Sequence, residues 1–195
     1  MPLVIGSFIS RHVYRGKLRT SHSPTTSKAC RFIDVNNGRE TKGGHSWINK
    51  EEARVVVKVA RLYESSGMSF RIITPYDAQR AHIESLLEVE GLSVNDKVFN
   101  VDSFQGNEDD HIIISVVRSQ GPGFLRNQRR TNVMLTRCKQ SMVICSSRGF
   151  LFGEASKTLV GKLATSVTRR NWIDGHEFLC GRVELCIDPL TLSVM

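Results

Sequence analysis

The fold class of this 195-residue chain is decided by residues 70–79, Phe70-Arg71-Ile72-Ile73-Thr74-Pro75-Tyr76-Asp77-Ala78-Gln79. The first five residues form a compact apolar run of strand length, and Pro75 ends it because proline has no backbone N–H to donate. Ile83, Leu86 and Leu87 then recur at helical spacing. The segment is therefore predicted to be a strand followed by a helix, the unit from which parallel sheets are built.

The same alternation continues on both sides of this segment. Further strands are predicted at Cys30–Val35, Val98–Asp102, Ile112–Val117 and Met142–Cys145, and helices at 5–13, about 50–65 and 132–138. The helix from about 50 to 65 is expected to begin at a capping box formed by Asn49 and Glu52. Alternating strands and helices predict an α/β protein, a parallel sheet with helices on both faces.

Three segments show no such pattern. Residues 17–28 are rich in Ser, Thr and basic residues and are predicted to be a loop, and Asn37-Gly38 with Gly43-Gly44 predicts a second exposed loop. After Thr168 one strand is expected around Val183–Ile187, with no evident place in the sheet. The chain is therefore divided into a domain at 3–168 and an appended tail at 169–195.

Composition restricts the class of partner. Lys and Arg total 27 against 19 Asp and Glu, and the resulting charge of +8 favours a polyanionic partner. With 40% hydrophobic and 24% charged residues the chain is typical of a globular protein, and no apolar run is long enough to cross a membrane. The five cysteines form no CxxC pair and the opening is unlike a secretory signal, so the cytosol or nucleus is expected.

Polar clusters follow the predicted strands. They are Thr74–Gln79, Asp102–Gly106, Arg118–Gly121, and Asn132 with Thr136 and Arg137 on the last predicted helix. Ligands of open parallel sheets bind at the carboxyl ends of the strands, so all four clusters are expected to converge there.

Several of these polar segments also have a simpler interpretation. Thr74-Pro75-Tyr76 can be only a strand end and a helix start, and Arg137 can be a surface arginine whose stem covers apolar atoms. Glu108-Asp109-Asp110 can be a solvated turn or the acids of a metal site. The phosphate-binding pattern GxxxxGK[ST] is not present in the chain, so a nucleoside triphosphate site of that type is not expected.

Three ordered blocks carry a family resemblance. They are Thr74-Pro75-Tyr76 with Gln79, the run Val101–Arg118 containing Asp102-Ser103-Phe104-Gln105-Gly106, and the run Gly123–Lys139 containing Asn132-Val133-Met134-Leu135-Thr136-Arg137. Together they resemble the second, C-terminal RecA-like domain of superfamily 1 RNA/DNA helicases, in the group of the nonsense-mediated-decay helicase, senataxin and immunoglobulin mu-binding helicases. The resemblance covers about residues 3–150 and implies a RecA-like, P-loop NTPase-type α/β fold.

The resemblance also implies roles for individual residues. Arg137 matches the arginine finger, which stabilises the charge that develops on the γ-phosphate of ATP. Gln105, Gly106 and Glu108 match the block that lies beside the nucleotide. Residues on the single-strand side correspond to Thr74, Pro75, Tyr76, Ser103 and Arg118. The implied partners are single-stranded RNA or DNA and a first RecA-like domain, in cis or in trans, that holds ATP and Mg²⁺.

The chain departs from the family at several points. Asn107 stands where the family commonly has Arg, and Cys138-Lys139 stands where it commonly has Ala-Arg. The first motor domain and the adenine-stacking tyrosine are not in the chain, so it is expected to be inactive alone and to bind no ATP or Mg²⁺ by itself. Two alternatives stay open: a stand-alone basic module that binds single strands without ATP, and a metal nuclease built on Glu108–Asp110.

Overall fold

The computed structural model describes residues 1–18 and 24–185. Within them a six-stranded sheet has the order β5-β4-β6-β7-β1-β8, and all of its neighbouring strands are parallel. The strands are β1 (Cys30–Asp34), β4 (Phe70–Thr74), β5 (Val98–Asn100), β6 (Asp109–Ser115), β7 (Cys138–Ser146) and β8 (Trp172–Asp174). The predicted parallel α/β sheet is thus confirmed.

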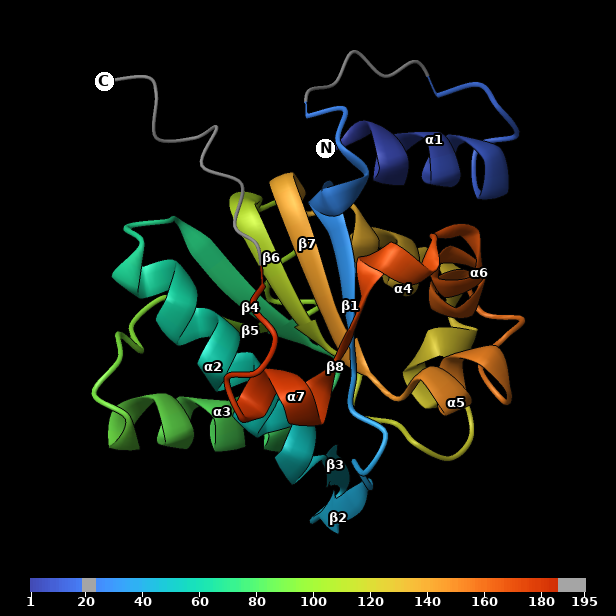
Figure 1. Ribbon diagram of the computed structural model, residues 1–195. Helices are drawn as coiled ribbons and strands as arrows, with labels where there is room; N and C mark the ends of the chain where they lie inside the picture. The colour runs from blue at the N-terminus through green and yellow to red at the C-terminus, as the bar shows by residue number, and fades with distance from the viewer. Residues whose placement is uncertain (19–23, 186–195) are drawn as a thin grey trace.

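Helices cover both faces of the sheet (Figure 1). One face carries α2 (Lys50–Ser65), α3 (Asp77–Val89) and α7 (Gly175–Leu179), and the other carries α4 (Gln128–Leu135), α5 (Arg148–Phe152) and α6 (Leu159–Ser166), with α1 (Leu3–His12) near the amino ends of the strands. Short 3-10 turns lie at Ser27–Ala29, Gly123–Arg126 and Arg169–Asn171. None of the helices in the described residues is long and apolar enough to cross a membrane.

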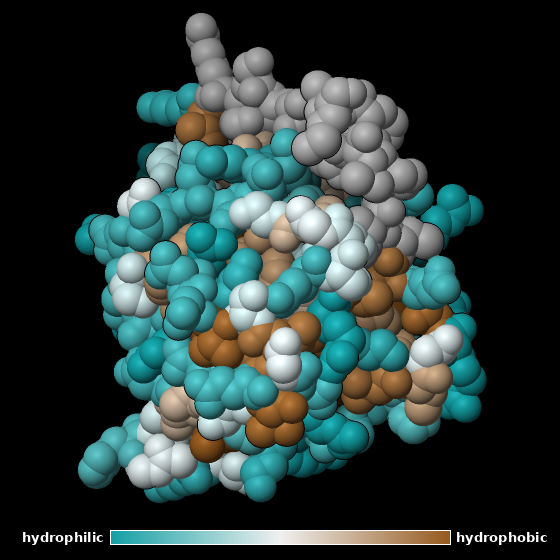
Figure 2. All heavy atoms as spheres, turned by 90° about the vertical axis from the view of Figure 1, so that its left-hand side faces the viewer, coloured by the Kyte–Doolittle hydropathy of each residue, from teal (hydrophilic) through white to brown (hydrophobic). Residues whose placement is uncertain are grey.

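Two hydrophobic clusters hold the layers together, one on each face. Successive strand side chains point to opposite faces, so Ile112 and Ile114 enter the cluster beneath α4 and α6, whereas Ile113 enters the cluster beneath α2. This explains why the strands read as continuous apolar runs rather than alternating ones. The outer surface over α2 and α3 is mostly hydrophilic, with hydrophobic residues visible in patches (Figure 2).

The start of α2 forms half of the predicted capping box. The side chain of Asn49 accepts the backbone N–H of Glu52 at 3.2 Å, as expected. The reciprocal bond is replaced, because the backbone N–H of Asn49 donates to Gln79 at 2.8 Å. The carboxyl group of Glu52 instead turns inward and accepts the backbone N–H of Val117 at 2.7 Å.

Three local predictions need correction. The helix expected at 132–138 spans Gln128–Leu135, and Cys138 already belongs to β7. The loop around Gly43-Gly44 is a hairpin of β2 (Thr41–Gly43) and β3 (Ser46–Ile48), turned by Gly44 at φ +62°. The predicted strand at 183–187 is not formed by residues 183–185, and its last two residues lie outside the described ranges.

The segment after Thr168 does have a place in the sheet. Strand β8 pairs in parallel with β1, aligning Phe32 with Trp172. The two rings stack with centroids 4.7 Å apart, and Lys58 on α2 donates a hydrogen bond to the carbonyl of Leu179 at the end of α7. Residues 169–179 are therefore packed against the domain, while residues 186–195 of the predicted tail lie outside the described part of the chain.

Candidate functional site

The predicted site residues divide between the two ends of the sheet. Because the strands are parallel, Thr74 at the end of β4 and Arg118 just after β6 lie at the carboxyl ends. Arg137 just before β7 and Glu108 just before β6 lie at the amino ends. The expectation that all four clusters converge at the carboxyl ends is therefore wrong. The reason is that residues 101–108 connect the carboxyl end of β5 to the amino end of β6, and that Arg137 follows α4 and directly precedes β7.

At the amino ends, Arg137 is hydrogen-bonded through all three of its guanidinium nitrogens. Nε donates to the carbonyl of Val133 at 2.8 Å, and one terminal nitrogen donates to the hydroxyl of Thr136 at 2.9 Å. The other terminal nitrogen donates to the carbonyl of Asn107 at 3.2 Å. All three acceptors are uncharged, so within the described residues the guanidinium is oriented without an ion pair that would neutralise its charge.

The loop before β6 brings the second block to Arg137. The backbone N–H of Asp109 donates to the carbonyl of Arg137 at 3.1 Å, and Glu108 lies 3.5 Å from Lys139. Gly106 has φ +88° with open space around it, so the left-handed backbone rather than crowding favours glycine there. Gln105 is exposed. The structure thus places Arg137 and Glu108 along one edge, with Gln105 and Gly106 on the loop that leads to it.

Asp102, near the start of the 101–108 loop, is held by a cation from α4. Asp102 forms an exposed ion pair with Arg130, whose guanidinium also lies 4.6 Å from the ring centroid of Phe124. Ser103 is tied to the end of β5, since its N–H donates to Asn100 at 2.7 Å. Arg130 therefore contributes to the position of the loop.

Two of the three acids considered for a metal site are paired with cations. Asp109 is almost buried and lies 2.8 Å from Arg71, while Glu108 faces Lys139. Among the residues that the structure describes, no group of three His, Cys, Asp or Glu side chains is placed to hold a metal ion.

At the carboxyl ends, Thr74, Pro75 and Tyr76 connect β4 to α3. Thr74 is fully buried, and its hydroxyl has no hydrogen-bond partner among the described residues. Pro75 and Tyr76 are half-buried, and the hydroxyl of Tyr76 accepts the N–H of Phe124 at 3.2 Å. Of this block, Pro75 and Tyr76 reach the surface, whereas the Thr74 side chain faces the interior.

Arg118 is held by groups that the sequence did not indicate. Its Nε donates to Glu40 at 2.9 Å, a terminal nitrogen donates to the carbonyl of Gln120 at 2.6 Å, and its guanidinium lies 4.5 Å from the ring centroid of Trp47. Burial opposes the charged form of Arg118, but its hydrogen bonds with Glu40 and Tyr76 raise its pKa.

Glu40 accounts for most of this arrangement. One carboxylate oxygen accepts Arg118 Nε and the N–H groups of Ser119 and Gln120, the last two at 2.6 and 2.9 Å. Burial alone would raise the pKa of Glu40, yet these hydrogen bonds lower it. Glu40 and Trp47 lie 78 and 71 positions before Arg118, so no local sequence signal connects them to it.

A buried polar network supports the loop that carries Arg118. Glu52 accepts the hydroxyl of Ser115 and the N–H of Val117, both at 2.7 Å, and Gln79 donates to Ser115 at 3.0 Å. Val117 has φ +73°, a conformation that a β-branched residue adopts only when its surroundings impose it. Complete burial raises the pKa of Glu52 to about 8.

The fold defines the class of this protein as a RecA-like α/β domain. Among solved structures, the C-terminal domain of a possible DNA helicase from Lactobacillus plantarum shares the fold with a TM-score of 0.52 and 12% identity, over 80% of this chain and 99% of that one. At that identity the likeness concerns the fold alone.

Sequence comparison identifies the family. A family model described as an AAA domain (AAA_12) matches residues 1–149, and the chain belongs to this family. It is 41% identical over 126 residues to a regulator of nonsense transcripts 1 homolog of Arabidopsis thaliana, covering 58% of this chain and 10% of that protein. It is 32% identical over 166 residues to the ATP-dependent helicase upf1 of Schizosaccharomyces pombe, covering 72% of this chain and 18% of that protein.

An uncharacterized ATP-dependent helicase of Methanocaldococcus jannaschii is 36% identical over 121 residues, which are 62% of this chain and 18% of that protein. The chain thus spans less than a fifth of the length of each of these three relatives. The resemblance to Upf1-type superfamily 1 helicases is confirmed, and the matched part corresponds to a helicase C-terminal domain.

Proposed function

We propose that this chain acts as the C-terminal motor domain of an ATP-dependent superfamily 1 RNA or DNA helicase, with Arg137 as its arginine finger. The observation that carries the proposal is the hydrogen bonding of Arg137. Its guanidinium is oriented by three neutral acceptors beside the 101–108 loop, and no carboxylate among the described residues is paired with it. An arginine finger needs that combination, because it must present a fixed positive charge to a developing anion.

ATP and Mg²⁺ would be held mainly by a first RecA-like domain, since this chain has no GxxxxGK[ST] sequence. Gln105, Gly106 and Glu108 would face the nucleotide from the same side as Arg137. The residues proposed for the single-strand side lie at the other end of the sheet, where Pro75, Tyr76 and Ser103 are accessible. Arg118 would act there mainly by holding its neighbours, because it is already hydrogen-bonded to Glu40, Gln120 and Tyr76.

The test is a fusion of this chain behind the first motor domain and interdomain segment of a related helicase. The fusion is expected to hydrolyse ATP when single-stranded RNA or DNA is added, while neither half does so alone. A folded fusion that binds single strands but shows no stimulated hydrolysis would contradict the motor role. That result would favour the second candidate, a basic module that binds single strands without ATP, which the charge of +8 supports.

A further inference from the structure

Trp47 is a large aromatic residue that packs with neither hydrophobic cluster of the domain. It lies on β3 of the β2–β3 hairpin, is half-buried, and is in neither the core nor the partly buried shell around it. The other tryptophan, Trp172, is different, because its ring stacks on Phe32 within the sheet. Burial in a core therefore does not explain a tryptophan at position 47.

The ring of Trp47 is held by an ordered cation. The guanidinium of Arg118 lies 4.5 Å from the ring centroid, a cation–π contact. Arg118 is itself fixed by Glu40, whose side chain is only 6% exposed. Glu40 stands at the base of the hairpin, so a nearly buried ion pair fastens both the hairpin and the aromatic ring to the end of β6.

The hairpin lies beside Tyr76. The hydroxyl of Ser46 accepts the N–H of Ala78 in the first turn of α3, at 3.3 Å. Arg118 also forms a hydrogen bond with Tyr76, and a side chain at Gly123 would collide with both of these groups. Trp47 and Tyr76 thus contact the same guanidinium at the carboxyl ends of the strands.

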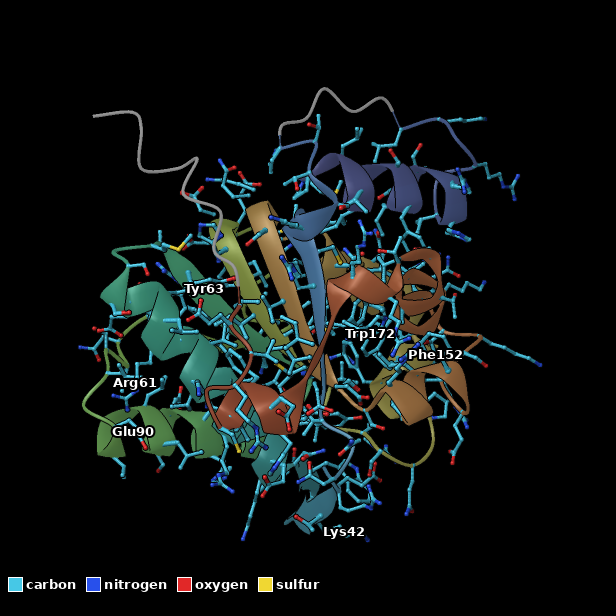
Figure 3. The ribbon with its side chains drawn as sticks, in the orientation of Figure 1. Lys42, Arg61, Tyr63, Glu90, Phe152 and Trp172 are labelled. Carbon is cyan, nitrogen blue, oxygen red and sulfur yellow. The ribbon has the colours of Figure 1, made fainter. Side chains whose placement is uncertain are left out.

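A lysine lies beside Trp47 on the hairpin. Lys42 is the cross-strand partner of Trp47, so the two side chains share one face of the hairpin. Lys42 is exposed, and Figure 3 shows it on the hairpin at the end of the molecule opposite α1. Proteins that bind single-stranded nucleic acids combine aromatic rings, on which bases stack, with cations that contact the phosphates.

We propose that Trp47 is a base-stacking residue for single-stranded RNA or DNA, and that Lys42 binds the adjacent phosphate. This proposal rests on the proposed function and extends its single-strand surface from Tyr76 onto the hairpin. Arg118 and Glu40 are positioning residues in this arrangement, because Arg118 holds the ring by its cation–π contact and Glu40 holds Arg118 by their ion pair.

The test uses the fluorescence of Trp47. The chain contains two tryptophans, so Trp172→Phe leaves Trp47 as the only one and keeps an aromatic ring against Phe32. Titration of this variant with an oligothymidylate is expected to quench the tryptophan fluorescence as the oligonucleotide binds. Binding is followed independently by the anisotropy of a dye on the oligonucleotide.

Substitutions separate stacking from charge. Trp47→Ala is expected to weaken binding about 5-fold or more, the loss typical of one stacked base, while Trp47→Phe keeps most of the affinity. Lys42→Ala is expected to lower the slope of log affinity against log salt by about 1. Circular dichroism of each variant checks that the fold is kept.

The outcomes are distinct. Oligonucleotide binding without quenching in the Trp172→Phe protein, together with unchanged affinity in Trp47→Ala, would overturn this inference and leave the proposed function standing. A chain that binds no single strand at low salt would overturn the proposed single-strand surface and this inference with it. Should Trp47→Ala unfold, the presence or absence of quenching in the Trp172→Phe protein still shows whether a base stacks on Trp47.

Discussion

Arg137 donates a hydrogen bond from its guanidinium to the backbone carbonyl of Asn107, 30 positions earlier in the chain, at 3.2 Å. The bond joins the end of α4 to the loop before β6, which are two separate blocks of the sequence. A change in the loop and a change in Arg137 are therefore expected to affect the same step of a motor cycle.

Arg137→Lys in the fusion with a first motor domain is expected to reduce ATP turnover by about 10³ or more. A lysine supplies one ammonium and cannot reproduce the forked donors that hold the guanidinium in place. Turnover is measured as phosphate release in saturating single-stranded RNA. Binding of the single strand without nucleotide is expected to change little.

The matched control for that experiment is Arg129→Lys. Arg129 is exposed on α4, the helix that precedes Arg137, whereas Arg130 forms an ion pair with Asp102 and is not a neutral comparison. Turnover in the Arg129 variant should stay near that of the parent fusion. If Arg137→Lys also leaves turnover unaltered, Arg137 is a surface arginine and the assignment is wrong.

The chain alone is expected to show no nucleic-acid-stimulated ATP hydrolysis. The reason is chemical, because it has no GxxxxGK[ST] loop to hold the phosphates and position Mg²⁺. Phosphate release is measured with and without single-stranded RNA. Hydrolysis by the chain alone that Arg137→Ala abolishes would contradict the prediction, while metal-dependent cleavage of RNA lost in Asp109→Ala would support the nuclease alternative.

Binding of single strands is expected to be weak, nearly independent of sequence and steeply reduced by salt, since contacts with phosphates dominate such binding. Tyr76→Ala should weaken it further, because the ring is lost. Tyr76→Phe is the control, as it keeps the ring and removes only the hydroxyl that Phe124 and Arg118 contact. Tight binding of one defined sequence that is insensitive to salt would instead indicate a dedicated recognition module.

Stability is expected to fall as the pH rises toward 8, because of Glu52. Its pKa is raised to about 8 by burial, so between its unfolded value of 4.5 and about 8 the folded state binds a proton that the unfolded state does not. Its contribution to stability is therefore complete below the unfolded pKa and is lost as the pH rises through the folded pKa. A single such group changes the free energy of unfolding by at most about 1.4 kcal/mol per pH unit.

Glu52→Gln tests this origin, because the amide keeps the shape and an acceptor for Val117 but does not titrate. Urea denaturation at several pH values should show a shallower loss of stability in the variant than in the parent chain. Equal slopes would mean that another group causes the pH dependence.

The sequence predicted the layered fold well because its evidence is local. Helix α2 was expected at about 50–65 and spans Lys50–Ser65, since an apolar stripe and an N-cap mark it within a few residues. The strand at 70–74 was likewise predicted with its bounds, because Pro75 marks its end.

The site was less predictable because its contacts are not local. The carboxyl oxygen of Glu40 and the donor nitrogen of Arg118 meet across 78 positions, and neither residue has a pattern that indicates the other. The predicted helix at 132–138 also hid the end of the sheet that Arg137 occupies, because α4 ends at Leu135 and Arg137 directly precedes β7. Strand β8 has only three residues, too few for a period to be recognised.

Strand β8 lies beyond the part of the chain that the family model matches, although it belongs to the folded sheet. The family match stops at residue 149, yet β8 protects the outer edge of β1 and α6 covers apolar side chains on the sheet. A recombinant polypeptide trimmed at that limit would expose the backbone N–H and C=O groups of β1 as a template for another chain. Such a polypeptide is expected to self-associate or precipitate. The end of the family match is therefore a poor guide to where this protein can be truncated.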